Sequence, residues 1–245
     1  MKAFVLAAGV GSRLKPWTDH HPKALVDIAG KPMIQRVIEN VVSSGIDGVV
    51  VNVHHFSEQI VDFLGSHDFG VNVMISDESS LLLDTGGGLR KAVNRFDEED
   101  VLVHNADILT DFDLSKLIAI HKAGGNDATL LLGDRSSSRK LVFDKDLQLK
   151  GWTNTATGEV KPGNLVTAPD DKFLSFQGIH ILSPGLYNRL IDYRPAETPF
   201  SIIDFYIEHA ATHNIAGVTI DENARWFDVG KPATLEEAIR YMTDK

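Results

Sequence analysis

The stretch that decides the fold lies near the amino terminus, where residues 3–25 read AFVLAAGVGSRLKPWTDHHPKAL. The apolar run Ala3–Ala8 predicts a buried strand that passes directly into a loop of small residues. Gly9 and Gly11 would let backbone N–H groups approach phosphate oxygens with no Cβ in the way. Arg13 and Lys23 add two cations, and the guanidinium fork of Arg13 suits phosphate. This stretch therefore predicts a strand followed by a triphosphate-binding loop.

Other glycine-rich loops fit the same residues less well. A P-loop has a Lys-Ser/Thr pair directly after its last glycine, but Ser12-Arg13 follow Gly11 here. A dinucleotide-binding loop has a third glycine where Leu14 stands. A plain strand–turn–helix with two solvated cations would explain Gly9-x-Gly11 taken alone, so the interpretation depends on the longer run.

Short β-rich runs and helical patterns alternate through the first 130 or so residues. Val37, Ile38, Val41 and Val42, for example, follow helical spacing. The pattern predicts strands at Ala3–Ala8, Gly48–Val53, Asn72–Ser76, Val101–His104 and Ala128–Leu132, with helices at Met33–Ser43, Ser57–Leu64, Gly88–Asn94 and Leu114–Lys122. This alternation indicates a largely parallel sheet covered on both faces.

The second half has a different order of elements. It predicts a hairpin, a loop through Asn164, a strand, two helices, two short strands and a last helix from Ala233. Their expected ranges are Lys140–Asp144, Leu147–Trp152, Phe173–Leu182, Pro184–Ile191, Pro199–His213, Val218–Ile220 and Trp226–Asp228. Because no linker or repeat divides the chain, we expect one domain over 1–245, with a nucleotide-binding half at about 1–135 and an acceptor-binding half at about 136–245.

Composition excludes several classes of protein. The net charge of −10 argues against general affinity for nucleic acids or anionic membranes, which reward clustered cations. The chain has no cysteine, which rules out disulfides and thiolate metal sites and fits a reducing cytoplasm. The first apolar run stops at Gly9 and is followed by Arg13 and Lys15, unlike a signal peptide. No apolar run approaches the length of a membrane span, so we expect a soluble, cytoplasmic protein.

Two aspartates are placed to hold Mg²⁺, which prefers a few carboxylate oxygens completed by phosphates and waters. Asp107 follows the strand at Val101–His104, at the carboxyl edge where open α/β sheets bind ligands. Asp228 ends another apolar strand. Asp111 and Asp113 imitate a metal motif, but Asp113 is better explained as the cap of the next helix. His20-His21 and His54-His55 have no third ligand at zinc spacing.

The run from Leu6 to Leu25, together with Gly30-Lys31-Pro32-Met33-Ile34, resembles the signature of the sugar-phosphate nucleotidyltransferase family. The resemblance implies a Rossmann-like three-layer α/β fold with a mixed central sheet, and transfer of a nucleotide from an NTP to a sugar 1-phosphate. It implies that Arg13, Lys23 and Asp107 are catalytic and that Asp107 and Asp228 hold Mg²⁺. The triphosphate would be wrapped by the loop residues Leu6, Ala7, Ala8, Gly9, Gly11, Ser12, Arg13 and Lys23.

The same resemblance extends to base and sugar recognition. Asp84, Thr85, Gly86 and Gly87 match the segment that contacts the base, and their Gly-Gly-Gly form looks most like the small enzymes that activate N-acetylmuramic acid 1-phosphate with UTP in peptidoglycan recycling. The Glu-Lys-Pro motif that binds the sugar phosphate in many relatives is missing, and the nearest Lys-Pro is Lys161-Pro162. The candidates for sugar contacts are Asn105, Asn154, Gln177 and Gly178, and no cation is assigned to the sugar phosphate.

Alternative functions remain open at this point. A guanylyltransferase acting on mannose or heptose 1-phosphate would share the motifs. A non-catalytic sugar-nucleotide sensor could keep the fold, although Arg13, Lys23, Asp107 and Asp228 are all present. A glycosyltransferase would more often show Asp-x-Asp without the Gly-x-Gly-x-Arg loop. We expect an NTP and a sugar 1-phosphate as ligands of a monomer or small homo-oligomer, with no left-handed β-helix and no acetyl transfer.

Overall fold

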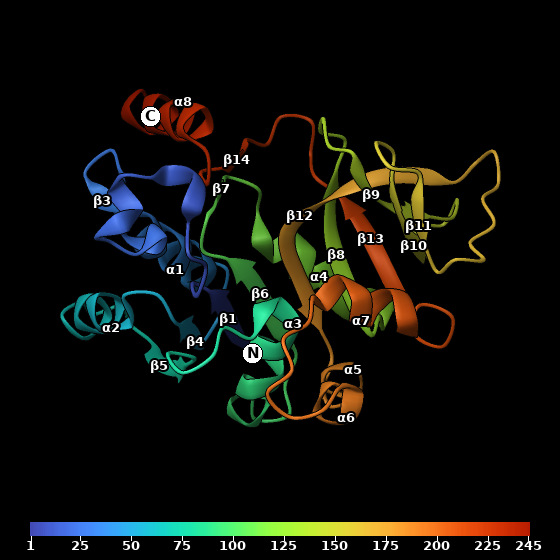
Figure 1. Cartoon of the computed structure of the whole chain (residues 1–245), viewed down its shortest axis with the longest axis horizontal. Coiled ribbons are helices and arrows are strands. Elements are labelled where there is room, and N and C mark those ends of the chain that lie inside the picture. Colours follow the sequence, from blue (N-terminus) through green and yellow to red (C-terminus); the bar gives the residue numbers. More distant parts are fainter.

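Four parallel strands form the part of the central sheet that carries the glycine-rich loop (Figure 1). The structure, a computed structural model, describes all residues from 1 to 245. These strands lie in the order β6-β1-β4-β5, and β1 stands between β4 and β6 with both pairings parallel. Their bounds are β1 Lys2–Leu6, β4 Gly48–Val53, β5 Asn72–Asp77 and β6 Val101–Asn105. The parallel half of the predicted sheet is therefore confirmed.

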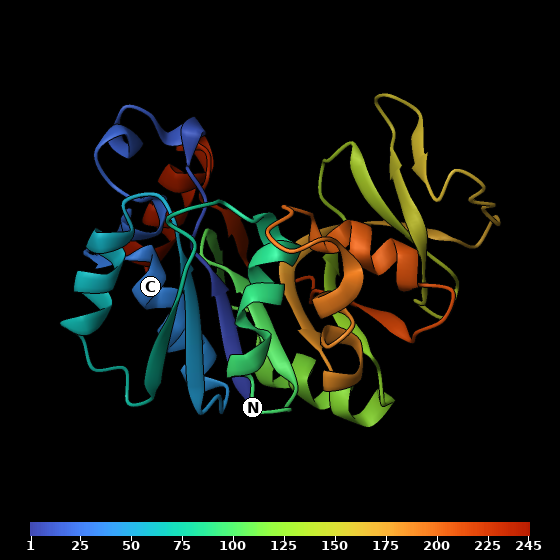
Figure 2. The same ribbon diagram turned by 60° about the horizontal axis from the view of Figure 1, so that its bottom comes forward.

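Antiparallel strands complete the ten-stranded mixed sheet. The long strand β12 (Lys172–Leu182) pairs with β6, β8 (Ala128–Gly133) and β9 (Arg139–Phe143), and β13 (Ile215–Thr219) runs parallel to β8. Beyond β9 lie β10 (Leu149–Asn154) and β11 (Glu159–Lys161). Figure 2 shows β9, β10 and β11 projecting at the end of the molecule opposite α2. The mixed sheet confirms the expected fold class.

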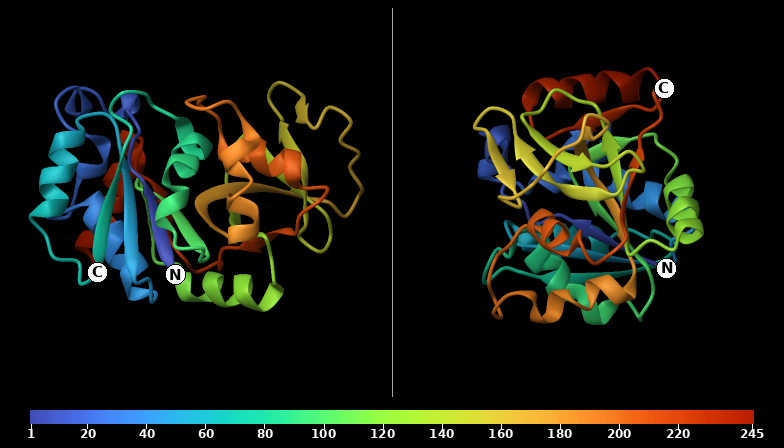
Figure 3. Two further views of the ribbon diagram at one scale, coloured as in Figure 1. Left: turned by 90° about the horizontal axis from the view of Figure 1, so that it is seen from below. Right: turned by 90° about the vertical axis from the view of Figure 1, so that its right-hand side faces the viewer.

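Helices cover both faces of the sheet (Figure 3). Alternate residues of β1 serve the two faces, since Ala3 and Val5 belong to one buried cluster and Phe4 to the other. The first cluster includes residues of α1 (Met33–Ser43), α2 (Ser57–Gly65), α4 (Leu114–Gly124) and α8 (Pro232–Thr243). The second includes residues of α3 (Asp84–Ala92), α5 (Pro184–Tyr187), α6 (Leu190–Tyr193) and α7 (Ile202–His209). This is the three-layer arrangement expected from the sequence.

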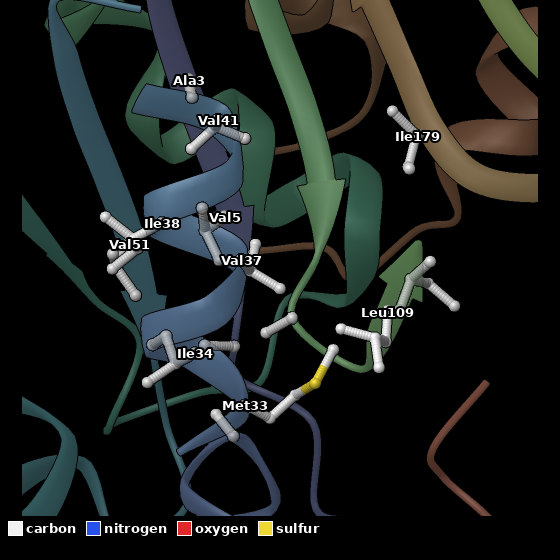
Figure 4. Close-up of a cluster of buried hydrophobic side chains, with 14 of the residues drawn as sticks. Ala3, Val5, Met33, Ile34, Val37, Ile38, Val41, Val51, Leu109 and Ile179 are labelled. Carbon is white, nitrogen blue, oxygen red and sulfur yellow. The ribbon is translucent and has the colours of Figure 1, made fainter. Parts of the chain in front are cut away.

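The helix α1 shows how the apolar pattern produces this packing. Ile34, Val37, Ile38 and Val41 follow the helical period and are buried. Figure 4 shows these side chains beside those of β1 and β4. Full burial of such a side chain contributes about 1.5–3 kcal/mol. The face of α1 therefore anchors the strands that support the glycine-rich loop.

Short elements shape the loops above the sheet. Two small antiparallel pairs lie outside it: β2 (Asp27–Ile28) with β3 (Lys31–Pro32), and β7 (Ile108–Thr110) with β14 (Trp226–Asp228). Single 3₁₀ turns lie at Ser12–Leu14, Trp17–Asp19, Lys23–Leu25 and Val93–Arg95. The chain contains no helix long and apolar enough to cross a membrane.

Several predicted boundaries are wrong for identifiable reasons. The helix α3 begins at Asp84 rather than Gly88, because packing against Phe200 supports a glycine-rich turn that propensity disfavours. The range Pro184–Ile191 forms parts of two short helices, and α7 is shorter at both ends than the expected Pro199–His213. The strands β7 and β11 lie where loops were expected. Asp113 is confirmed as a cap, since its Oδ1 accepts a hydrogen bond of 2.9 Å from Ser115 N.

Candidate active site

A cavity of about 500 Å³ opens at the carboxyl ends of the parallel strands. Leu6, Asn52 and Asn105 end or nearly end three adjacent strands in one register, so the backbone turns away from the sheet there. The predicted residues that line the cavity are Leu6, Ala7, Ala8, Gly9, Gly11, Ser12, Arg13, Lys23, Asp84, Thr85, Asn105 and Asp107. The structure adds Ala24, Asn52, Leu82, Ala106 and Pro199, which sequence reasoning missed.

The glycine-rich loop needs glycine at a defined point. Gly11 has a φ of +68°, and a Cβ there would lie 2.8 Å from Lys23 Cβ. The Thr18 hydroxyl donates a hydrogen bond of 3.0 Å to the Gly11 carbonyl and closes the loop. Gly9 has no atom within 4 Å of the position a Cβ would take. The loop is thus tight at Gly11 and open at Gly9, where it borders the cavity.

Asn52 and Glu78 fix the loop from beneath. Asn52 accepts a hydrogen bond of 2.7 Å from Ala7 N and donates one of 2.7 Å to Glu78 Oε1. The other carboxylate oxygen of Glu78 accepts a hydrogen bond of 3.1 Å from Leu83 N, just before α3. Burial raises the pKa of the Glu78 carboxyl, while these hydrogen bonds oppose the rise. A polar Asn within the valine-rich run Gly48–Val53 is the sequence signal that could have indicated this anchor.

The pair β7–β14 brings Asp107 and Asp228 together from distant parts of the chain. Asp228 is paired with Ile108, the residue after Asp107. Val229 N also donates a hydrogen bond of 3.0 Å to the Asp107 carbonyl. The two carboxylates therefore stand on neighbouring backbone segments, as the metal hypothesis requires.

Each carboxylate faces one of the two predicted cations. Lys23 Nζ forms an ion pair with Asp107 Oδ2, and Arg13 lies 3.8 Å from Asp228 Oδ2. Gly230 lies where these groups converge. A Cβ at Gly230 would lie 2.5 Å from Lys23 Nζ, 2.8 Å from the Arg13 guanidinium and 2.8 Å from Asp228 Oδ1. The structure thus gathers all four predicted charged residues and shows that Gly230 leaves them room.

The predicted base-contacting segment divides into two parts. Asp84 and Thr85 line the cavity. Gly86 and Gly87 do not line it, and both of their N–H groups donate to the Phe200 carbonyl, at 2.9 and 3.3 Å. A Cβ at Gly86 would lie 2.3 Å from the Phe200 ring. The structure therefore places these two glycines in packing against Phe200, unlike the expected position against a base.

The four residues expected to contact the sugar are not gathered in the cavity. Asn105 lines it, and Gly178, with a φ of +76°, adjoins Asn105, since a Cβ there would lie 2.8 Å from Asn105 Nδ2. Gln177 is buried, and its amide donates 3.0 Å to the Ser175 carbonyl. Asn154 does not line the cavity. Its Oδ1 accepts a hydrogen bond of 3.1 Å from Ala156 N in a turn. The side chains of Gln177 and Asn154 thus form hydrogen bonds with nearby backbone groups.

The carboxylates suit a cation that takes only part of its coordination from protein. The structure holds no group of three or more His, Cys, Asp or Glu side chains arranged around a metal position. Mg²⁺ is often held by one or two carboxylates together with substrate phosphates and waters. Asp107 and Asp228, beside a cavity with two phosphate-directed cations, fit that donor set.

Comparisons with known proteins agree with this geometry. The family model described as "Nucleotidyl transferase" matches residues 2–143. An N-acetylmuramate alpha-1-phosphate uridylyltransferase of Caulobacter vibrioides is 29% identical, over 94% of this chain and 92% of its own. A mannose-1-phosphate guanyltransferase of Gibberella zeae is 30% identical over 95% of this chain, which spans 61% of that relative.

Solved structures share the fold. A putative glucose-1-phosphate thymidylyltransferase from Bacillus anthracis superposes with a TM-score of 0.83, at 18% identity and coverage of 100% of this chain and 96% of that one. HddC from Yersinia pseudotuberculosis gives 0.77 at 22% identity, covering 98% and 99%. The likeness extends over the whole chain.

Proposed function

Because this chain belongs to the nucleotidyl transferase family, we propose that its cavity joins the nucleoside monophosphate of an NTP to a sugar 1-phosphate and releases pyrophosphate. The observation that carries the proposal is the convergence of Arg13 and Lys23 with Asp107 and Asp228 beside a glycine-rich loop. Two cations suit a triphosphate, and two carboxylates suit the metal that accompanies it.

Arg13 and Lys23 would stabilise the charge that develops as the α-phosphorus is attacked. Their present partners are carboxylates at the cavity, so an incoming triphosphate would compete for the same N–H donors. The glycine-rich loop would hold the phosphates through backbone N–H groups. Asp107 and Asp228 would hold Mg²⁺, which neutralises phosphate charge when bound.

The reaction would be a direct displacement. An oxygen of the sugar phosphate forms a bond to the α-phosphorus as the bond from that phosphorus to the β-phosphate oxygen breaks, and pyrophosphate leaves. The cavity lining holds no His or Cys, and the Thr85 hydroxyl already accepts 2.9 Å from Ile202 N. The Ser12 hydroxyl forms no hydrogen bond with a basic group, which supports a reaction without a covalent enzyme intermediate.

UTP with N-acetylmuramic acid 1-phosphate is our specific substrate assignment, which would place the protein in peptidoglycan recycling. A site that reads guanine would more often offer a carboxylate to the amino edge of the base, and Asp84 and Glu78 are the candidates. Glu78 is buried and committed to Asn52 and Leu83, so it has no surface toward the cavity. Asp84 lines the cavity, but one of its carboxylate oxygens accepts a hydrogen bond of 2.6 Å from Thr85 N. The Caulobacter relative supports the uridylyl assignment.

A guanylyltransferase acting on mannose or heptose 1-phosphate is the second candidate, because the Gibberella relative has nearly the same sequence identity, 30% against 29%. A matrix of UTP, GTP, dTTP and ATP against N-acetylmuramic acid, glucose, mannose and heptose 1-phosphates separates the two, with pyrophosphate as the readout. We expect the highest kcat/KM for UTP with N-acetylmuramic acid 1-phosphate. A tenfold preference, about 1.4 kcal/mol, for GTP with mannose or heptose 1-phosphate would overturn the uridylyl assignment alone. Failure of every pair would favour a binding protein without catalysis.

A further inference from the structure

A sugar phosphate calls for a cation, and four lysines of the acceptor half already form ion pairs with aspartates. Lys150 lies 2.6 Å from Asp171, and Lys140 lies 3.2 Å from Asp134. Lys161, of the Lys-Pro pair noted in the sequence, lies 3.0 Å from Asp204 on α7 and close to the Trp152 ring. These ion pairs direct attention to the arginines.

Arg135 follows β8 and reaches across to the strand that carries Asp228. Its guanidinium lies 4.5 Å from the centre of the Trp226 ring. Trp226 and Asp228 are two positions apart on β14 (Trp226–Asp228), so their side chains share one face of that strand. The Trp226 ring is itself held in place, because its Nε1 donates a hydrogen bond of 2.9 Å to the Gln177 carbonyl. Arg135 therefore stacks on the face of β14 that also presents a candidate metal ligand.

The donors of Arg135 are mostly uncommitted. One guanidinium N–H donates a hydrogen bond of 3.0 Å to the Phe176 carbonyl, and no carboxylate of the protein forms an ion pair with the Arg135 side chain. Burial lowers the pKa of this guanidinium, while the charges of Asp228 and Asp107 act to raise it. Stacked on Trp226, Arg135 thus keeps N–H donors for a ligand, and its planar fork suits phosphate oxygens.

Arg135 also lines a polar hollow. The hollow is lined by loop 134–138 together with Lys140 and Thr155, and none of these residues is apolar. Three of the residues are serines, Ser136–Ser138. Hydroxyl groups of this kind suit the hydroxyls of a sugar ring. Arg135 therefore lines a surface fit for a sugar and also stacks on the strand that carries Asp228.

We propose that Arg135 binds the phosphate of the sugar 1-phosphate and orients its attacking oxygen toward the α-phosphorus, in the role that a missing lysine motif leaves vacant. The inference rests on the proposed function. It assigns to one arginine a contact that the sequence left open, and it predicts that the arginine acts on the acceptor rather than on the NTP.

The test compares Arg135→Met and Arg135→Lys with two other arginine variants. Arg139→Met removes a neighbouring exposed arginine that could compete for the role. Arg95→Met is a control, since the one hydrogen bond of the Arg95 side chain is a long one of 3.3 Å to the Lys91 carbonyl near the end of α3. Initial rates are measured with the acceptor that the wild-type protein uses best, varying the acceptor and the NTP in turn. Equilibrium binding of that sugar 1-phosphate is measured separately with a non-hydrolysable NTP analogue, and thermal unfolding reports folding.

We expect Arg135→Met to raise the KM and Kd for the sugar 1-phosphate about 10- to 100-fold, as loss of one charge-assisted contact implies. The KM for NTP should stay within about twofold, because acceptor and NTP contacts differ. Arg135→Lys should lie between, since it keeps charge without the fork, and Arg95→Met should match wild type. The inference is overturned if Arg135→Met behaves like Arg95→Met, if Arg139→Met alone weakens the acceptor, or if both substrates weaken equally in a folded Arg135→Met protein. A wild-type protein inactive with every acceptor would instead overturn the proposed function, and this inference with it.

Discussion

Val229 N donates a hydrogen bond of 3.0 Å to the carbonyl of Asp107, joining the backbones that carry the two candidate metal ligands. Asp107 and Asp228 lie about 120 positions apart in the sequence, and the pairing of β7 with β14 brings them together. The charged site therefore depends on tertiary structure formed by the last fifth of the chain as much as on the glycine-rich loop. This relationship leads to the first prediction.

Asp107→Asn and Asp228→Asn should each lower Mg²⁺-dependent turnover by about 100-fold or more, because each keeps the shape and removes the charge that holds the cation. Asp113→Asn is a matched control, since Asn also caps helices and Asp113 lies at the start of α4. Initial rates of pyrophosphate release across a Mg²⁺ titration test this. Near-normal rates in both site variants would show that the metal is held elsewhere.

Arg13→Ala should reduce kcat by roughly 10²- to 10³-fold, the usual effect of losing one donor that stabilises transition-state charge. Lys23→Ala should also raise the KM for NTP, since we assign Lys23 partly to ground-state binding. Lys15→Ala serves as the control, because Lys15 is exposed and pairs with Asp19 at 2.8 Å. Steady-state kinetics measure all three, and unchanged turnover of Arg13→Ala would move the phosphate site away from this loop.

Asn52→Ala should destabilise the protein by about 1–3 kcal/mol, because it leaves the Ala7 N–H and the buried Oε1 of Glu78 without their hydrogen-bond partner. The loop above would lose its anchor, so the KM for NTP should rise as well. Asn40→Ala, at a half-buried position of α1 where the Asn40 side chain makes no hydrogen bond, provides the comparison. Urea unfolding and NTP-dependent kinetics test the two effects, and a protein with both quantities unchanged would rule out the anchoring role.

Gly230→Ala should impair catalysis more than stability. Its methyl group would enter the space between Lys23, Arg13 and Asp228, and the ends of these side chains can shift without disturbing the core. We expect kcat/KM to fall at least tenfold, or about 1.4 kcal/mol, with little change in thermal unfolding. Gly163→Ala, where no atom lies within 4 Å of the added Cβ, is the matched control. Equal kinetics for the two variants would contradict the crowding argument.

Acid should destabilise the fold partly through His180, which lies fully in the core with Nδ1 2.5 Å from the Tyr206 hydroxyl. Burial lowers its pKa from 6.5 to about 3. The unfolded chain therefore binds a proton below pH 6.5 that the folded protein does not, so stability is present above that pH and falls as the pH drops toward 3. Between pH 7 and 5 this histidine should account for a loss of about 2 kcal/mol.

Urea unfolding of wild type and His180→Gln at pH 7 and pH 5 measures that contribution. We expect the wild-type protein to lose about 2 kcal/mol more than the variant on acidification. The comparison within each protein removes the effect of the substitution itself on packing. Identical losses would mean that His180 is protonated in the folded protein.

The sequence predicted the elements whose signals are local. Gly11 and Arg13 are close along the chain, and the strand before them is strongly apolar, so the strand and the glycine-rich loop could be predicted from the residues alone. The stripe on α1 likewise followed from helical spacing. Asp107 and Asp228 were identified because each follows an apolar strand, although their proximity came only from the pairing of β7 with β14.

What escaped prediction depends on contacts between distant residues. Gly86 and Gly87 suggested an open segment for a base, but Phe200 packs against them from more than 110 positions away. The roles of Asn52 and Gly230 are visible only once their neighbours are placed. Arg135 belongs to a serine-rich loop without a recognisable motif, and it is the stacking on Trp226 that directs it toward the carboxylates.

The most direct test of the central claim is the stoichiometry of acceptor-dependent pyrophosphate release. The wild-type protein is incubated with Mg²⁺ and UTP, either with or without N-acetylmuramic acid 1-phosphate. Pyrophosphate and UDP-sugar are quantified in the same sample. Parallel reactions use GTP and the other sugar 1-phosphates. The account predicts equal amounts of pyrophosphate and nucleoside-diphosphate sugar for at least one pair, with no pyrophosphate when the acceptor is omitted. Pyrophosphate release that is independent of every acceptor, or absent with all of them, would contradict it.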